Sequence, residues 1–177
     1  DALEAHLNEQ NTIEILQQAD LVIDCTDNFA ARYLINDTCH ALKKPWIYAS
    51  IFQFSGQCAV FTPEGPCFRC VFPSPPSEAT DCNTAGVLGV LPGMLGTIQA
   101  TEAIKYLLNL EGSLSSQLLL VESLDMHMQT IALASDPLCP CCGNGDINNT
   151  GENPDAVACQ QAISNESFQG QQISADS

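Results

Sequence analysis

Cys67-Phe68-Arg69-Cys70 and Cys139-Pro140-Cys141-Cys142 are two CxxC segments that lie far apart in the chain. We call them the first knuckle and the second knuckle. Two such half-sites are the usual way in which a protein offers four thiolates to one tetrahedral zinc ion. Binding both to one metal would close everything between them into a single loop. The spacing therefore predicts a structural zinc site. Its predicted ligands are Cys67, Cys70, Cys139 and Cys142.

Other uses of these cysteines remain open from the sequence. Disulfides need an oxidising compartment, whereas the chain begins without the basic and apolar segments of a secretory signal. A redox-active CxxC would need a thiol of low pKa at a helix N-terminus, and the turn before Cys67 fits a knuckle better. Cys141 is an alternative fourth ligand. Cysteines inside apolar patterns are interpreted as buried thiols. They are Cys25, Cys39 and Cys58.

The composition excludes several classes of partner. The 177 residues carry 21 acidic and 5 basic side chains, a formal net charge of −16. Nucleic acids and anionic membranes attract a basic face, so neither is expected to bind. The longest apolar run, Ala85 to Ile98, is interrupted by Pro92 and by glycines, so no membrane span is expected. We expect a cytoplasmic protein.

Hydrophobic patterning predicts an α/β fold with a mixed sheet. Asp20-Leu21-Val22-Ile23-Asp24 is typical of a buried parallel strand, and open α/β sheets bind ligands at the carboxyl ends of such strands. Helices are predicted at Asn11 to Leu16, Phe29 to Lys44 and Gly93 to Leu110, and further strands at Trp46 to Ile51, Gln57 to Phe61, Gln117 to Ser123 and His127 to Leu133. A turn is expected at Ser55-Gly56.

The helix at Gly93 to Leu110 is expected to bury its apolar side chains, and Gly96 to allow close approach of a neighbour. That apolar set is Leu95, Ile98, Ile104, Leu107 and Leu108. After Gly143 the sequence is dominated by Asn, Gln, Ser and Gly, which predicts a disordered tail at residues 144–177 and a folded domain at residues 1–143.

Several of these segments together resemble one family. They are Leu21-Val22-Ile23-Asp24-Cys25-Thr26-Asp27-Asn28-Phe29, Glu64-Gly65-Pro66 with the first knuckle, Gly93-Met94-Leu95-Gly96-Thr97-Ile98-Gln99-Ala100, and the second knuckle with Gly143. The chain resembles the MoeB/ThiF/HesA adenylyltransferases, relatives of ubiquitin-activating enzymes, over nearly all of residues 1–143. The MoeB-type enzymes that serve molybdopterin synthase are the most similar.

The resemblance implies a Rossmann-like adenylation fold that dimerises and acts on a small ubiquitin-like sulfur carrier ending in Gly-Gly. The carrier's C-terminal carboxylate attacks the α-phosphate of ATP, which gives an acyl-adenylate and pyrophosphate. Another protein then converts the adenylate to a thiocarboxylate. The pathway is molybdenum-cofactor or thiamine-type sulfur transfer.

The resemblance also assigns roles to single residues. Asp27 falls on the family's Mg²⁺ and nucleotide carboxylate; the alternative is that it caps the helix beginning at Phe29. Asn28 assists it. Arg32 steadies a phosphate, or is an exposed helix arginine. Cys82 falls on the cysteine of acyl or sulfur transfer; the alternative is a spectator thiol, because no basic residue lies beside it.

The chain departs from the family in its phosphate-binding residues. It contains no GxGxxG motif, and its lysines are Lys43, Lys44 and Lys105. Family members carry a glycine-rich loop, an arginine and a lysine upstream of the matched region. The chain is therefore expected to be the C-terminal portion of such an enzyme, inactive alone. The alternative is a non-catalytic zinc-stabilised module that binds a ubiquitin-like carrier.

Overall fold

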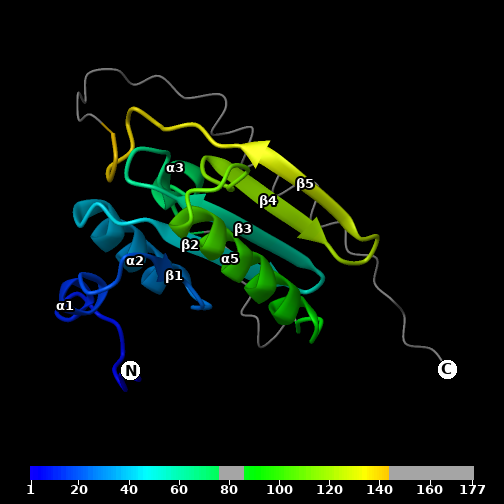
Figure 1. Cartoon of the computed structure of the whole chain (residues 1–177), viewed down its shortest axis with the longest axis horizontal. Helices are drawn as coiled ribbons and strands as arrows, with labels where there is room; N and C mark the ends of the chain where they lie inside the picture. Colours follow the sequence, from blue (N-terminus) through cyan, green and yellow to red (C-terminus); the bar gives the residue numbers. More distant parts are fainter. Residues whose placement is uncertain (76–85, 144–177) are drawn as a thin grey trace.

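A five-stranded mixed sheet forms the centre of the chain, in the order β1-β2-β3-β4-β5 (Figure 1). The computed structural model describes residues 1–75 and 86–143. Its strands are β1 (Val22–Ile23), β2 (Trp46–Phe52), β3 (Ser55–Phe61), β4 (Gln117–Glu122) and β5 (His127–Ala132). β1 pairs with β2 in parallel, and the remaining pairs are antiparallel. The predicted mixed α/β sheet is confirmed.

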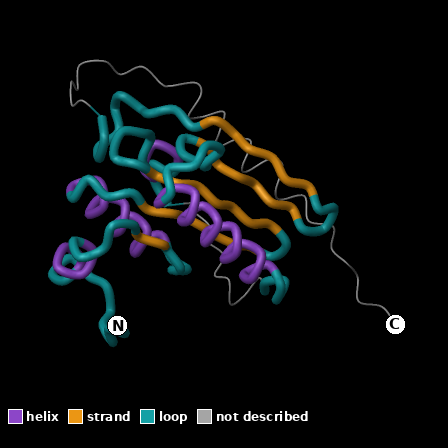
Figure 2. Tube along the Cα trace, in the orientation of Figure 1, coloured by secondary structure: helices purple, strands orange, loops and turns teal. Residues whose placement is uncertain are grey.

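Helices cover both faces of this sheet, so the described chain has three layers (Figure 2). The helices are α1 (Thr12–Leu16), α2 (Phe29–Ala41), α3 (Phe68–Val71) and α5 (Leu91–Leu107). Successive side chains of a strand point to opposite faces, and on β2 Trp46 packs with α1, α2 and α3 whereas Ile47 packs with α5. Among the described residues no helix is long and apolar enough to cross a membrane.

Aromatic rings fill the face covered by α2 and α3. Phe68 is completely buried, and its ring centroid lies 4.7 Å from that of Phe72 and 5.2 Å from that of Tyr48. Burying a side chain of this size contributes about 1.5–3 kcal/mol to folding. Phe68 is a residue of the first knuckle, so the hydrophobic core holds the knuckle in place.

The buried side of α5 differs from the prediction. Leu95 is buried as expected, but Leu107 is 61% exposed and Ile104 is 57% exposed. Gln99 and Glu102 are buried instead. Each is compensated by a hydrogen bond: Gln99 Nε2 donates to the Asp24 carbonyl at 2.8 Å, and Glu102 Oε2 accepts from the Leu114 N–H at 2.8 Å. Leu108 is also exposed, so three of the five predicted core residues lie on the outer surface.

The glycine at which α5 approaches the sheet and the position of the β2–β3 turn also differ from the predictions. A Cβ on Gly96 would meet nothing within 4 Å, whereas one on Gly56 would lie 2.6 Å from Leu95 Cδ2, so α5 approaches the sheet at Gly56. Phe52 pairs with Ser55, so the β2–β3 turn is at Gln53-Phe54 and not at Ser55-Gly56.

α5 ends earlier than the predicted Leu110. Asn109 has a positive φ of 50°, and its N–H donates to the Tyr106 carbonyl at 3.0 Å. The Leu110 N–H donates to the Lys105 carbonyl at 2.8 Å. These two bonds form a Schellman motif, in which Asn replaces the more usual Gly.

Candidate functional site

The four predicted zinc ligands lie together. The Sγ atoms of Cys67, Cys70, Cys139 and Cys142 are all within 4.8 Å of one another. The closest pairs are Cys70–Cys142 at 3.2 Å and Cys67–Cys139 at 3.5 Å, and all four are free thiols. Four sulfurs held 2.3 Å from a tetrahedral zinc ion would be about 3.8 Å apart. The cluster therefore has the dimensions of a four-thiolate metal site.

The four thiols lie close enough to shift one another's pKa. Hydrogen bonds from Cys67 and then Cys70 lower the pKa of Cys139, and the same contacts raise the pKa of Cys67 and of Cys70. Burial raises the pKa of Cys142 to about 12. Four thiolates held this close together would repel one another, so a cation between them would be needed to keep all four deprotonated. The donor set fits a thiolate-preferring divalent metal such as zinc.

Local backbone contacts shape both knuckles. In the first knuckle the Cys70 N–H donates to the Cys67 carbonyl at 3.0 Å. In the second the Gly143 N–H donates to the Cys139 carbonyl at 2.9 Å, and a Cβ on Gly143 would lie 2.5 Å from the Pro137 carbonyl oxygen. The chain therefore needs glycine at this position to close the second knuckle.

Cys141 lies outside the group of four sulfurs. Its Sγ accepts a hydrogen bond from Asn36 Nδ2 at 3.4 Å. Asn36 belongs to α2 and is buried. The structure favours Cys142 over Cys141 as the fourth ligand.

A second group of polar residues lies at the carboxyl end of β1. Asn28 Oδ1 accepts from the Ala31 N–H at 2.8 Å, so Asn28 is the N-cap of α2. The alternative that Asp27 caps this helix is therefore wrong. Asp27 is exposed, and its carboxylate contacts the neighbouring Asn28 Nδ2 at 3.4 Å. Its carboxylate is therefore available to a ligand in solution.

Arg32 is buried beneath this strand end, so the alternative of an exposed helix arginine is wrong. Its Nη2 donates to the Thr26 carbonyl at 2.8 Å, and its Nε lies 3.4 Å from Asp24 Oδ2. The guanidinium also lies 5.3 Å from the centre of the Tyr48 ring. Asp24 is 2% exposed, so the pair forms a buried ionic contact that holds residues 24–26.

The remaining cysteines divide into two groups. Cys39 and Cys58 are buried as predicted, and burial raises the pKa of each to about 12. Cys25 is exposed, which corrects the prediction that it is buried, because β1 ends at Ile23 and Cys25 lies beyond the strand. Cys82 lies outside the described residues, as does the predicted tail at 144–177.

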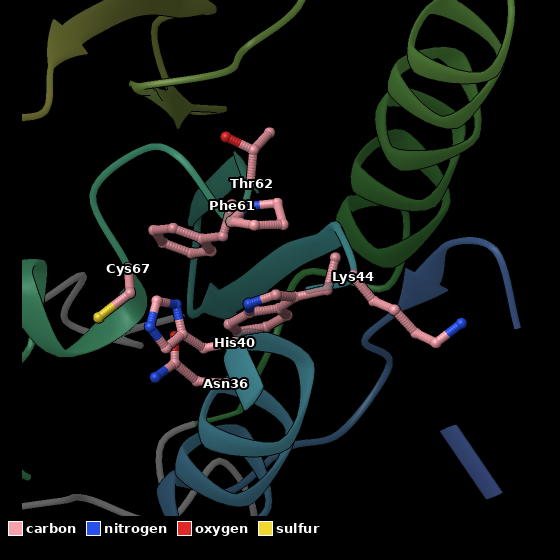
Figure 3. A pocket seen from close by; sticks show the side chains of 8 residues that line it. Asn36, His40, Lys44, Phe61, Thr62 and Cys67 are labelled. Atoms are coloured by element: carbon pink, nitrogen blue, oxygen red, sulfur yellow. The ribbon is translucent and has the colours of Figure 1, made fainter. Parts of the chain in front are cut away.

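A small pocket with about 10 Å³ of free space lies beside the cysteine cluster (Figure 3). Figure 3 shows Asn36 and His40 on α2 and Cys67 on the facing loop, with Phe61 and Thr62 beyond them. Sites for small organic ligands usually measure about 300–1,000 Å³. This pocket is therefore too small for a nucleotide.

Sequence reasoning missed two polar residues that organise these sites. Asp24 was assigned only to the end of a strand, and Asn36 was not singled out. Arg32, Asn36 and Cys39 follow the i, i+4, i+7 spacing of one helix face, and all three are buried. The available signal for Asn36 was its place in α2 directly after Ile35 and three residues before Cys39, two apolar positions of that helix.

Comparison with known sequences places this fold among characterised proteins. The ThiF family model matches residues 1–141. The chain is 42% identical over 151 residues to the SAMP-activating enzyme E1 of Haloferax volcanii, a match that covers 84% of the chain and 56% of the relative. It is 41% identical over 152 residues to the sulfur carrier protein adenylyltransferase of Thermus thermophilus, covering 81% of the chain and 56% of the relative. The chain thus spans about half the length of these relatives.

Solved structures share the fold at much lower identity. Escherichia coli MccB superposes with a TM-score of 0.67 at 16% identity, covering 85% of this chain and 47% of MccB. A heterocyclase solved with substrate and cofactor gives a TM-score of 0.59 at 15% identity, covering 81% of this chain and 24% of the enzyme. At such identities the likeness concerns the fold alone.

Proposed function

The chain belongs to the ThiF family, and from this we propose that it takes part in the ATP-dependent adenylation of a small ubiquitin-like sulfur carrier. The observation that carries the proposal is its identity of 42% and 41% to a SAMP-activating enzyme and a sulfur carrier protein adenylyltransferase. In this reaction a carboxylate oxygen of the carrier's C-terminal glycine bonds to the α-phosphorus of ATP, and pyrophosphate leaves. The products are an acyl-adenylate and pyrophosphate.

Asp27 is the proposed Mg²⁺ ligand at the nucleotide site. Its exposed carboxylate lies beyond the carboxyl end of β1, where open α/β sheets bind ligands. A bound Mg²⁺ would neutralise phosphate charge as pyrophosphate leaves, and carboxylate oxygen is its preferred protein ligand. Asn28 supports Asp27 by capping α2. Arg32 is buried and holds residues 24–26 through its hydrogen bond to the Thr26 carbonyl. It would therefore support nucleotide binding through this loop.

The cysteine cluster is proposed to hold a structural zinc ion. All four donors are thiols of the chain, which leaves no open position for water or substrate. The metal would therefore stabilise the domain and take no direct part in the adenylation step. Cys82 remains the proposed acceptor in any later acyl or sulfur transfer.

The finer assignments follow the family resemblance. We propose a carrier of the molybdopterin-synthase or thiamine type that ends in Gly-Gly, a homodimeric assembly and a cytoplasmic location. The exposed apolar side chains of α5 support a dimer, because Ile104 and Leu107 are each more than half exposed. Light scattering tests this assembly, and a monomer at micromolar concentration would contradict it.

Calorimetric titration with ATP·Mg²⁺, with and without a carrier protein ending in Gly-Gly, tests the proposed activity. The chain should bind both, and Asp27→Asn should abolish nucleotide binding while leaving carrier binding intact. Asp20→Asn, an exposed carboxylate preceding the same strand, is the matched control. Binding of the carrier without ATP would favour the non-catalytic module instead, and binding of neither would overturn both functions.

A further inference from the structure

We propose that Asn36 is a positioning residue for the metal centre, and that its side-chain amide fixes the position of the two knuckles relative to each other. The inference rests on the proposed metal site and concerns what assembles it. Asn36 lies on α2, is 1% exposed, and contributes no sulfur to the cluster. Its effect on the metal is therefore exerted through the residues that it contacts.

A single amide contacts an inner residue of each knuckle. Asn36 Oδ1 accepts from the Phe68 N–H at 2.8 Å, and Phe68 lies between Cys67 and Cys70. Asn36 Nδ2 donates to Cys141 Sγ at 3.4 Å, and Cys141 lies between Cys139 and Cys142. These contacts bridge sequence separations of 32 and 105 residues, so Asn36 connects α2 with both halves of the site.

The orientation of this amide is fixed by its neighbours. Asn36 Nδ2 also donates to Asp37 Oδ1 at 3.0 Å, and an ionised carboxylate can only accept. Asp37 is in turn held by Arg69, whose Nε and Nη2 donate to it at 2.8 Å and 2.7 Å. Arg69 is the other inner residue of the first knuckle, and its guanidinium lies 4.4 Å from the centre of the Tyr33 ring. α2 therefore holds both inner residues of the first knuckle.

The second knuckle depends more strongly on such contacts. It follows β5 and contains no helix or strand, so the sheet does not position it directly. The segment just before it contacts the first knuckle through the Asp136 N–H, which donates to Cys70 Sγ at 3.4 Å. Outer contacts of this kind orient metal ligands, and losing one typically weakens metal binding about 10- to 100-fold.

Asn36→Asp tests the inference with almost no change in side-chain shape. It keeps the oxygen that accepts from Phe68, but places a carboxylate oxygen against Asp37 and Cys141 where a donor stood. Cys39→Ala is the matched control, because Cys39 is a fully buried residue on the same helix outside the sulfur cluster. Zinc affinity of the whole chain is measured by competition with a chromogenic chelator, and the sulfur coordination by Co²⁺ absorption.

We expect Asn36→Asp to bind zinc about 10- to 100-fold more weakly, with the four-thiolate Co²⁺ spectrum retained at saturation. Cys39→Ala should lower the melting temperature without changing zinc affinity. Unchanged affinity in Asn36→Asp, or an equal loss in both variants, would overturn the positioning role. If the unmodified chain binds no zinc, the proposed metal site itself fails, which is a separate result.

Discussion

The metal centre and the strand-end site are built in opposite ways. In the metal centre, three of the four cysteines are buried and every sulfur faces the others. At the carboxyl end of β1, Asp27 is exposed, and the side-chain partner the structure shows for it is the adjacent Asn28. A closed donor set is typical of a structural metal, whereas an open one leaves room for substrate. The comparison is consistent with the two proposed roles, a structural metal site at the knuckles and a ligand site at the end of β1.

The largest expected effect concerns Arg32, whose buried side chain supports the strand-end site. Arg32→Gln should lower the free energy of unfolding by about 3–5 kcal/mol, because it leaves Asp24 charged and buried without its partner. Chemical denaturation followed by circular dichroism measures this. Lys43→Gln, an exposed residue beyond the end of the same helix, should change stability by less than about 0.5 kcal/mol. If the two variants lowered the free energy of unfolding equally, the contact between Arg32 and Asp24 would not support the strand-end site.

Removing one ligand tests whether the metal centre is closed. Structural zinc sites with four ligands bind with about 10–16 kcal/mol, so loss of one should weaken zinc roughly 10²- to 10³-fold. We expect this of Cys70→Ser, measured by chelator competition. Cys58→Ser removes a buried cysteine outside the cluster and should leave zinc affinity unchanged. A small loss in Cys70→Ser would indicate an open or mixed donor set.

Asp27→Asn tests whether the strand-end site binds the Mg²⁺ ion that accompanies ATP. Assayed together with the phosphate-binding segment that this chain lacks, the variant should slow carrier-dependent ATP–pyrophosphate exchange about 10²-fold and raise the Mg²⁺ concentration needed for half-maximal rate. Because Asp27 is exposed and Asn28 caps the helix, folding stability should change little. A variant with full exchange activity at low Mg²⁺ would place the metal elsewhere.

The smallest expected effect separates Cys141 from the metal ligands. Cys141→Ser keeps an acceptor for Asn36 Nδ2, so zinc affinity should fall less than about threefold, whereas Cys141→Ala should cost more. Zinc competition with both variants measures the difference. A loss in Cys141→Ser as large as that in Cys70→Ser would make Cys141 a ligand.

Much of the fold could be predicted because its signals are local. The strands follow alternating or continuous apolar runs, and the paired spacing of the knuckles indicated which four cysteines meet. The packing of α5 could not be read in this way, because Gln99 and Glu102 are buried through partners 75 and 12 residues away. Arg32 shows the same limitation, since its burial depends on carbonyls at Thr26 and Ala49.

The path of the chain between the two knuckles determines how many residues a bound metal ion would tether. Cys67 and Cys139 are 72 residues apart, but the sheet already brings the two knuckles together, because β3 leads into the first, β5 leads into the second, and β4 pairs with both strands. The last such contact before the second knuckle is at Leu133, whose N–H donates to the Ser116 carbonyl. A bound ion would therefore tether only about seven further residues, whose loop-closure entropy is roughly 2 kcal/mol smaller than that of the full separation. Such an ion would latch this short segment to the first knuckle, and we expect the sheet to stay assembled when the ion is removed.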